Sequence, residues 1–149
     1  MTRCFLALTL AATVLSTAAA QPAPRIGRVD VCRDGGCGES LYFEDDFEDQ
    51  GACPIFRSDD DVGTIVRIDG VQTSIHEVSR RTETAHDASA GVTRRYTVRV
   101  YRPRSGRFEV ETWTRYEALG YEHGLVYGGL TIRKAGRTTT ARVRGTAGC

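Results

Sequence analysis

The chain has 149 residues, of which 20 are basic, 19 are acidic and 40% are hydrophobic, and its formal net charge is +1. This near-neutral balance gives no general attraction to phosphate, which argues against a nucleic-acid partner. The length suits one domain with a modest core, and no shift in composition requires a second domain.

The first 20 residues have the layout of a secretory signal peptide. Arg3 supplies a positive start, residues 5–14 are apolar, and Ala18 to Ala20 offer small residues for cleavage. The apolar run is too short to span a bilayer, and no later segment reaches the roughly 20 apolar residues that a spanning helix needs. We therefore expect an exported protein, periplasmic or extracellular, without a transmembrane segment.

The expected organisation is a signal peptide at 1–20, a flexible leader at 21–29 and a single disulfide-stapled domain at 30–149. The chain holds nineteen arginines, one lysine and no asparagine. This bias is typical of a GC-rich bacterial genome, and the lack of asparagine excludes N-linked glycosylation.

Four cysteines follow the signal segment: Cys32, Cys37, Cys53 and Cys149. An even number in an oxidising compartment predicts two disulfides, with three connectivities open. The preferred pairing is Cys32 with Cys37 around a short turn, and Cys53 with Cys149. The spacing lacks the CxxC pairs of zinc sites, so no metal or other cofactor is expected.

The segment from Glu39 to Asp61 is strongly acidic. Ser40 is a candidate cap for a short helix ended by Gly51, and an acidic loop is the alternative. Calcium is a candidate ligand for these carboxylates, but the spacing from Asp59 does not match an EF-hand loop. Solvated acidic surface is the favoured interpretation.

Beyond Val62 the pattern predicts strands in series. Thr64, Val66 and Ile68 alternate with polar positions, and Asp69-Gly70 predicts a turn into a second strand over 71–80. A polar stretch over 82–91 is expected to connect this strand to the next one.

The longest alternating run lies between Thr93 and Tyr116 and predicts a hairpin. Tyr96, Val98 and Val100 on its first arm and Phe108 and Val110 on its second are expected to face the interior together. Only an odd-numbered loop allows this, which would place Arg99 opposite Glu111 or Glu109. Such an exposed pair contributes only about 0.2–1 kcal/mol.

A last hairpin is predicted from strands over 125–134 and 138–144. A two-residue Ala135-Gly136 turn would place Ile132 opposite Thr139, Leu130 opposite Ala141 and Gly128 opposite Val143. About six strands in series indicate an all-β antiparallel meander, closed as a small barrel or folded as a sandwich, with the barrel slightly favoured. The predicted core comprises Val66, Ile68, Ile75, Tyr96, Val98, Val100, Phe108, Val110, Val126, Leu130, Ile132 and Val143.

Charge divides unevenly along the chain. Residues 21–62 carry 4 basic and 11 acidic side chains, whereas residues 63–149 carry 15 basic and 8 acidic ones. We expect the acidic part to lie against the basic sheet and neutralise it.

The sheet face opposite the predicted core collects aromatic and arginine side chains, the types that dominate binding hot spots. The candidate binding residues are Tyr101, Trp113, Tyr127, Arg99, Arg115 and Arg133, with Arg142 on the same face. The alternative is that Trp113 packs beneath the acidic N-terminal segment.

The preferred function is a non-enzymatic macromolecule-binding protein, an inhibitor or an envelope accessory, with another protein or an envelope component as partner. Its general build is similar to that of the periplasmic inhibitors of lysozyme.

A ribonuclease-like hydrolase is the alternative function. Glu109 or Glu111 as base, Arg115 on phosphate and His123 as acid resemble, in residue types, the small secreted ribonucleases of bacteria. No motif of that family is matched, and the N-terminal helix that the resemblance implies is weak.

Overall fold

The computed structural model describes residues 21–32, 37–49, 51–87, 90–119 and 122–149. Its regular secondary structure is nearly all strand, which confirms the all-β antiparallel prediction. In chain order the elements are β1 (Ile26–Gly27), β2 (Gly38–Phe43), the short 3-10 helix η1 (Glu44–Asp46), β3 (Phe56–Asp59), β4 (Gly63–Ile68), β5 (Val71–Asp87), β6 (Val92–Arg102), β7 (Glu109–Ala118), β8 (His123–Lys134) and β9 (Arg137–Gly148).

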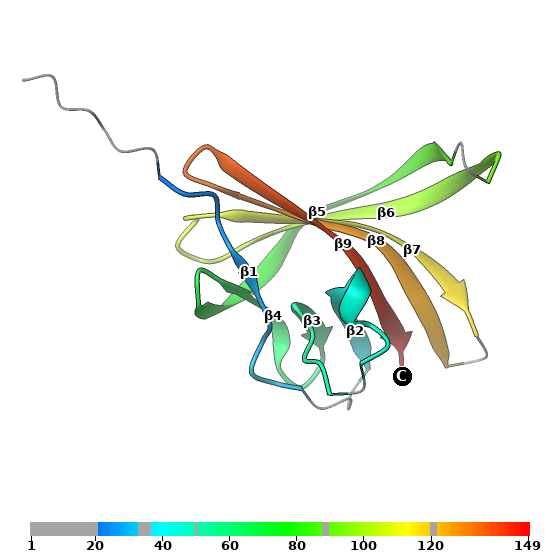
Figure 1. Cartoon of the computed structure of the whole chain (residues 1–149), viewed down its shortest axis with the longest axis horizontal. Coiled ribbons are helices and arrows are strands. Elements are labelled where there is room, and N and C mark those ends of the chain that lie inside the picture. Colours follow the sequence, from blue (N-terminus) through cyan, green and yellow to red (C-terminus); the bar gives the residue numbers. More distant parts are fainter. Residues whose placement is uncertain (1–20, 33–36, 50, 88–89, 120–121) are drawn as a thin grey trace, which may run out of the picture.

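Strands β2 to β9 form a closed eight-stranded barrel in which each strand pairs with the next along the chain. Pairing between β2 and β9 closes the barrel, and β1 adds to the end of β4 (Figure 1). Closure pairs the edges that an open meander would expose. No helix among the described residues is long and apolar enough to cross a membrane.

Both predicted tight turns are present. Asp69-Gly70 and Ala135-Gly136 all have positive φ, the geometry of a two-residue hairpin turn that follows strand twist. The second turn pairs Ile132 with Thr139, Leu130 with Ala141 and Gly128 with Val143, as predicted.

The acidic segment contains two strands that were not predicted. Instead of a short helix from Ser40 to Gly51, β2 covers Gly38–Phe43, and the only helical turn described there is η1. Leu41 lies opposite Phe56 and Gly145, so its side chain is completely buried in the barrel. Pairing with two neighbouring strands and burial of Leu41 outweigh the local capping signal.

The polar stretch over 82–91 is also strand where the structure describes it, because β5 continues to Asp87 and β6 begins at Val92. Only the first five residues of β5 pair with β4, and β6 pairs with β7 only from Thr97 to Tyr101, so the outer part of the β5–β6 hairpin projects beyond the barrel (Figure 1). Both faces of this arm meet solvent, which explains its polar sequence.

The predicted register of the β6–β7 hairpin is wrong. Tyr101 lies opposite Val110 and Arg99 opposite Thr112, so the connection contains an even number of residues. Arg99 and Tyr101 therefore share the interior face with Val110, while Val98 and Val100 lie on the outer face.

The barrel interior holds most of the predicted core. Val66, Ile68, Ile75, Val110, Val126, Leu130, Ile132 and Val143 belong to one buried cluster, against which Phe108 packs. Tyr96, Val98 and Val100 lie outside this cluster. Val98 is nonetheless only 2% exposed, because it lies between Arg81 and Trp113 on the neighbouring strands. The cluster adds Leu41, Ile55, Phe56 and Tyr101, and the Phe56 and Tyr101 rings meet edge to face at 5.2 Å.

The expected leader docks on the barrel instead of hanging free. We call residues 24–32 the N-terminal strap. Pro24 and Val29 are buried, and the Val29 amide donates to the Pro54 carbonyl at 2.8 Å. The strap covers one end of the barrel, where Thr139 donates to the Pro24 carbonyl at 2.5 Å.

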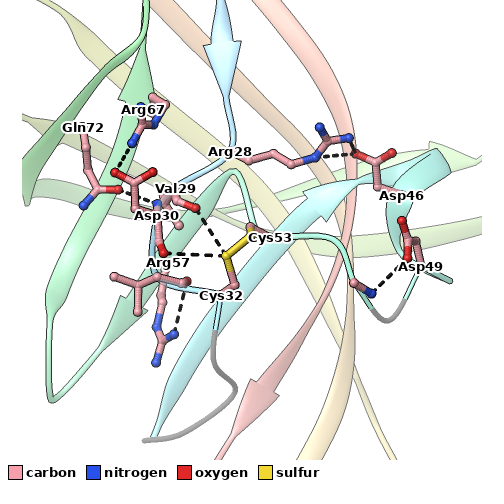
Figure 2. The surroundings of a disulfide bond; sticks show 12 residues. Arg28, Val29, Asp30, Cys32, Asp46, Asp49, Cys53, Arg57, Arg67 and Gln72 are labelled. Atoms are coloured by element: carbon pink, nitrogen blue, oxygen red, sulfur yellow. Dashed lines mark hydrogen bonds and ion pairs between the residues drawn. A yellow bond between two sulfur atoms is a disulfide. The ribbon is translucent and has the colours of Figure 1, made fainter.

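Two disulfides are present, but the preferred pairing is wrong. Cys32 pairs with Cys53 and Cys37 with Cys149. Figure 2 shows the first bridge joining the strap to the segment before β3. The second joins the start of β2 to the residue after β9, because β2 and β9 pair at that point. The docked strap places Cys32 beside Cys53 and leaves Cys37 for the C-terminal cysteine.

Loss of the two disulfides should destabilise the protein unequally. The bridges close sequence separations of 21 and 112 residues. Chain entropy then predicts losses of about 3 kcal/mol for Cys32→Ser with Cys53→Ser, and about 5 kcal/mol for Cys37→Ser with Cys149→Ser. Urea denaturation of the two double variants measures both values. A larger loss for the Cys32 and Cys53 variant would contradict barrel closure through Cys37 and Cys149.

Candidate functional site

The even β6–β7 register separates the predicted binding residues into two groups. Arg99 and Tyr101 lie inside the barrel, while Trp113, which pairs with Val98, lies outside. Arg115 and Tyr127 are opposite each other on the outer face of β7 and β8. Of the candidate binding residues, Trp113, Arg115 and Tyr127 therefore share the outer face, whereas Arg99 and Tyr101 point into the barrel.

The outer surface carries a continuous row of aromatic and arginine side chains. We call it the outer row, and it comprises Tyr96, Trp113, Arg115, Tyr127, Arg144 and Phe47. The Tyr96 and Trp113 rings meet at 5.5 Å, and the Arg115 guanidinium lies 4.4 Å from the Tyr127 ring centre. Arg144 lies over the same tyrosine at 5.3 Å and over Phe47 at 4.8 Å.

Trp113 lies directly over Gly129 of the neighbouring strand. A Cβ atom at Gly129 would overlap the indole ring, so only glycine lets the tryptophan lie flat against the sheet. Trp113 is half-buried by Gly129 and Tyr96.

Within the acidic segment, β2 pairs with β9, and β8 lies between β9 and the Trp113 strand β7. Arg142 meets Glu44 at 3.3 Å and Arg144 meets Glu48 at 3.2 Å. These contacts place acidic residues of the first half of the chain against the basic sheet, as the charge distribution predicts.

The barrel interior changes from apolar to polar toward the end that contains the β2 start and the β9 terminus. Here Arg99 donates to Glu39 at 2.6 Å, and their side chains are only 22% and 12% exposed. Burial acts to lower the pKa of Arg99, but the Glu39 carboxylate more than offsets this and raises it. Burial also raises the pKa of Tyr101 to about 12.

Several polar atoms near this ion pair lack a hydrogen-bond partner among the described residues. They are Glu39 Oε1, Arg99 Nε and the hydroxyl of Thr112, which is fully buried opposite Arg99. A hollow of about 270 Å³ opens beside Glu39 and Arg99, and it is lined by Glu39, Thr97, Arg99, Thr114, Arg115, Tyr116, Val126, Ala147 and Gly148. A second hollow of about 270 Å³ on the rim shares Glu39 and includes His123.

Sequence reasoning missed Glu39, Thr97, Thr112 and Thr114 as site residues. Thr112 and Thr114 follow Val110 at spacings of two, and Glu39 precedes Leu41 in the same way. That spacing was a usable signal, because residues two apart in a strand share a face.

The rim carries a second buried ion pair, between Arg57 and Asp59. Asp59 also accepts from the backbone amides of Val62 at 2.8 Å and Asp61 at 3.0 Å, which fixes the β3–β4 turn. Burial acts to raise the pKa of Asp59, but these hydrogen bonds and the Arg57 charge outweigh it and hold the pKa below its ordinary value.

The residues of the ribonuclease-like alternative are not brought together. Glu109 lies opposite Arg133, whereas His123 begins β8 at the other end of the same ladder. Glu109 is nine positions from Ala118, the partner of Gly124, which corresponds to roughly 30 Å along a strand. Arg133 bonds both Glu109 and Glu111 at 3.3 Å, so the two glutamates belong to an outer ion-pair cluster.

Within the described ranges, no three histidine, cysteine, aspartate or glutamate side chains group closely enough to hold a metal ion. No protein-family model, curated protein or solved structure matches the chain.

The Arg99–Glu39 pair should behave as a buried interaction. Arg99→Met leaves the Glu39 carboxylate buried without its cation, and we expect a loss of about 2–4 kcal/mol in the free energy of unfolding. The double variant Glu39→Gln with Arg99→Met removes both charges and should recover at least half of this loss. Urea denaturation measures both. A single-variant loss within the 0–1 kcal/mol range of surface pairs would show that the pair is solvated.

Asp59 should make the protein less stable in acid. Because its folded-state pKa is depressed, its stabilising contribution is present above its unfolded pKa of about 4 and lost as pH falls through the folded value. Asp59→Asn should therefore be less stable than the parent at pH 7, and the difference should shrink below about pH 4. The exposed neighbour variant Asp61→Asn is the control. A difference that stays constant down to pH 2 would contradict this role.

Proposed function

We propose that the protein is an exported bacterial binding protein that recognises another macromolecule through the outer row. The layout of residues 1–20 and the arginine-rich, lysine-poor composition support export from a bacterium. Two disulfides fit an oxidising compartment, which means the periplasm or the medium.

The outer row is the main structural evidence for this proposal. Tryptophan, tyrosine and arginine are enriched in binding hot spots, because they desolvate a large area for a small loss of side-chain entropy. Strands of the closed barrel hold five of its six members, and ring and guanidinium contacts fix their positions. A partner would thus meet a surface that is already ordered, which lowers the entropic cost of association.

A binding role is favoured over ribonuclease chemistry by the placement of the charged residues. General acid and base catalysis requires both groups within reach of one substrate. Glu109 and Glu111 are engaged by arginines at one end of β7, and His123 lies at the other end. Inhibition of a secreted hydrolase and an accessory role in the envelope are the two forms of binding that suit a small stapled barrel.

Substitution in the outer row should abolish partner capture while the barrel stays folded. We expect Trp113→Ala and Tyr127→Ala each to weaken binding by at least about 30-fold, the effect of a hot-spot truncation of 2 kcal/mol. Immobilised parent and variants are incubated with envelope extract and medium of the source bacterium, and retained proteins are identified by mass spectrometry.

Val71→Ala is the matched control, because Val71 is a 64% exposed apolar residue far from the outer row. Circular dichroism of each variant confirms its fold. Equal capture by the parent and by a folded Trp113→Ala variant would disprove the assignment of this surface.

A further inference from the structure

We propose that the hollow at the polar end of the barrel binds one ring of a neutral sugar. Arg115 is the one residue that belongs to the outer row and also lines the hollow, and the other lining residues are not members of the outer row.

The hollow forms where β6 and β7 part. Their ladder ends at Thr97 opposite Thr114, although β7 continues to Ala118 and β6 begins at Val92. Its volume of about 270 Å³ lies just below the 300–1,000 Å³ of pockets that take drug-sized ligands. This size fits a single six-membered ring with its substituents.

The charges around the hollow cancel one another. Arg99 pairs with Glu39, and Arg115 pairs with Glu117. An ionic ligand would lose its hydration and find no uncompensated charge in return. The charge balance therefore favours a neutral ligand.

The unpartnered polar atoms indicate which neutral chemistry fits. Two of these atoms belong to residues that line the hollow: Glu39 Oε1 is an acceptor and Arg99 Nε is a donor. A buried polar atom without a partner costs about 1–3 kcal/mol, so a ligand that bonds both atoms gains more than an exposed hydrogen bond would give. Adjacent hydroxyl groups on a sugar ring donate and accept at once, and Thr97 and Thr114 add two more hydroxyls to the lining.

Tyr116 supplies an aromatic wall. Its ring lies directly over Gly124, where a Cβ atom would overlap it. Tyr116 is 54% exposed and lines the hollow. The C–H face of a sugar ring packs on an exposed aromatic face, and Val126 and Ala147 provide further apolar lining.

Saturation-transfer NMR on the full folded protein tests the proposal. The probes are the neutral sugars D-glucose, D-galactose and N-acetyl-D-glucosamine and the charged compounds D-glucuronate and glycine. We expect transfer to at least one neutral sugar and weaker or no transfer to the charged probes. Thr97→Val keeps the side-chain shape, removes a hydroxyl that lines the hollow, and should weaken sugar binding by about 2–10-fold, the worth of one hydrogen bond.

Thr114→Val is a second lining variant that should also weaken binding. Thr131→Val is the matched control, because Thr131 is a buried threonine whose hydroxyl bonds Thr140 instead of lining the hollow. No transfer to any neutral sugar, or transfer to the charged probes alone, would overturn the proposal. Equal weakening by Thr131→Val would likewise overturn the location of the site. None of these substitutions changes a residue of the outer row. A negative result for sugar binding therefore leaves the proposed macromolecule binding untouched, and the capture experiment tests that binding separately.

Discussion

The pairing of Tyr101 with Val110 is the constraint on which the rest of the structure depends. Successive residues of a strand face opposite sides, so this single register decides that Thr97, Arg99 and Tyr101 point into the barrel. A buried guanidinium requires a partner, and closure of the barrel by β2 brings Glu39 to within 2.6 Å of it. The same register places Val98 beside Trp113 and builds the outer row. The interior polar site and the exterior aromatic surface are therefore two consequences of one pairing.

The two ends of the barrel differ because, among the described residues, the N-terminal strap covers only one of them. The N-terminal strap docks at the apolar end, where the Val29 amide bonds Pro54 and Thr139 bonds Pro24. At the other end the Cys37–Cys149 bridge holds β2 and β9 together, while β6 and β7 separate and leave a hollow. Closure of an eight-stranded barrel leaves an interior just wide enough for side chains or one small ligand. Short side chains such as Thr97 and Thr114 explain why space is left at the polar end.

The sequence was sufficient to predict elements whose signals are local. Alternation and the Ala135-Gly136 turn gave the β8–β9 register, and the residues of the central hairpin are strand as expected. Elements set by distant contacts were not predictable in this way. β2 is strand because β3 and β9 flank it, and the cysteine pairing follows from the docked strap. The predicted β6–β7 register was wrong because alternating apolar and polar residues show that a strand has two different faces, but they do not show which face points into the barrel. Val98 and Val100 are apolar but lie outside, beneath longer side chains.

The most direct test of this account is the register of the β6–β7 hairpin in solution, measured by nuclear Overhauser contacts between backbone protons of opposite residues. In an antiparallel ladder directly opposite residues come within about 4.5–5.5 Å at Cα, close enough for such contacts. The structure predicts cross-strand contacts of Arg99 with Thr112 and of Tyr101 with Val110. Contacts of Arg99 with Glu111 or Glu109 would turn its side chain into solvent and contradict both the buried ion pair and the interior site.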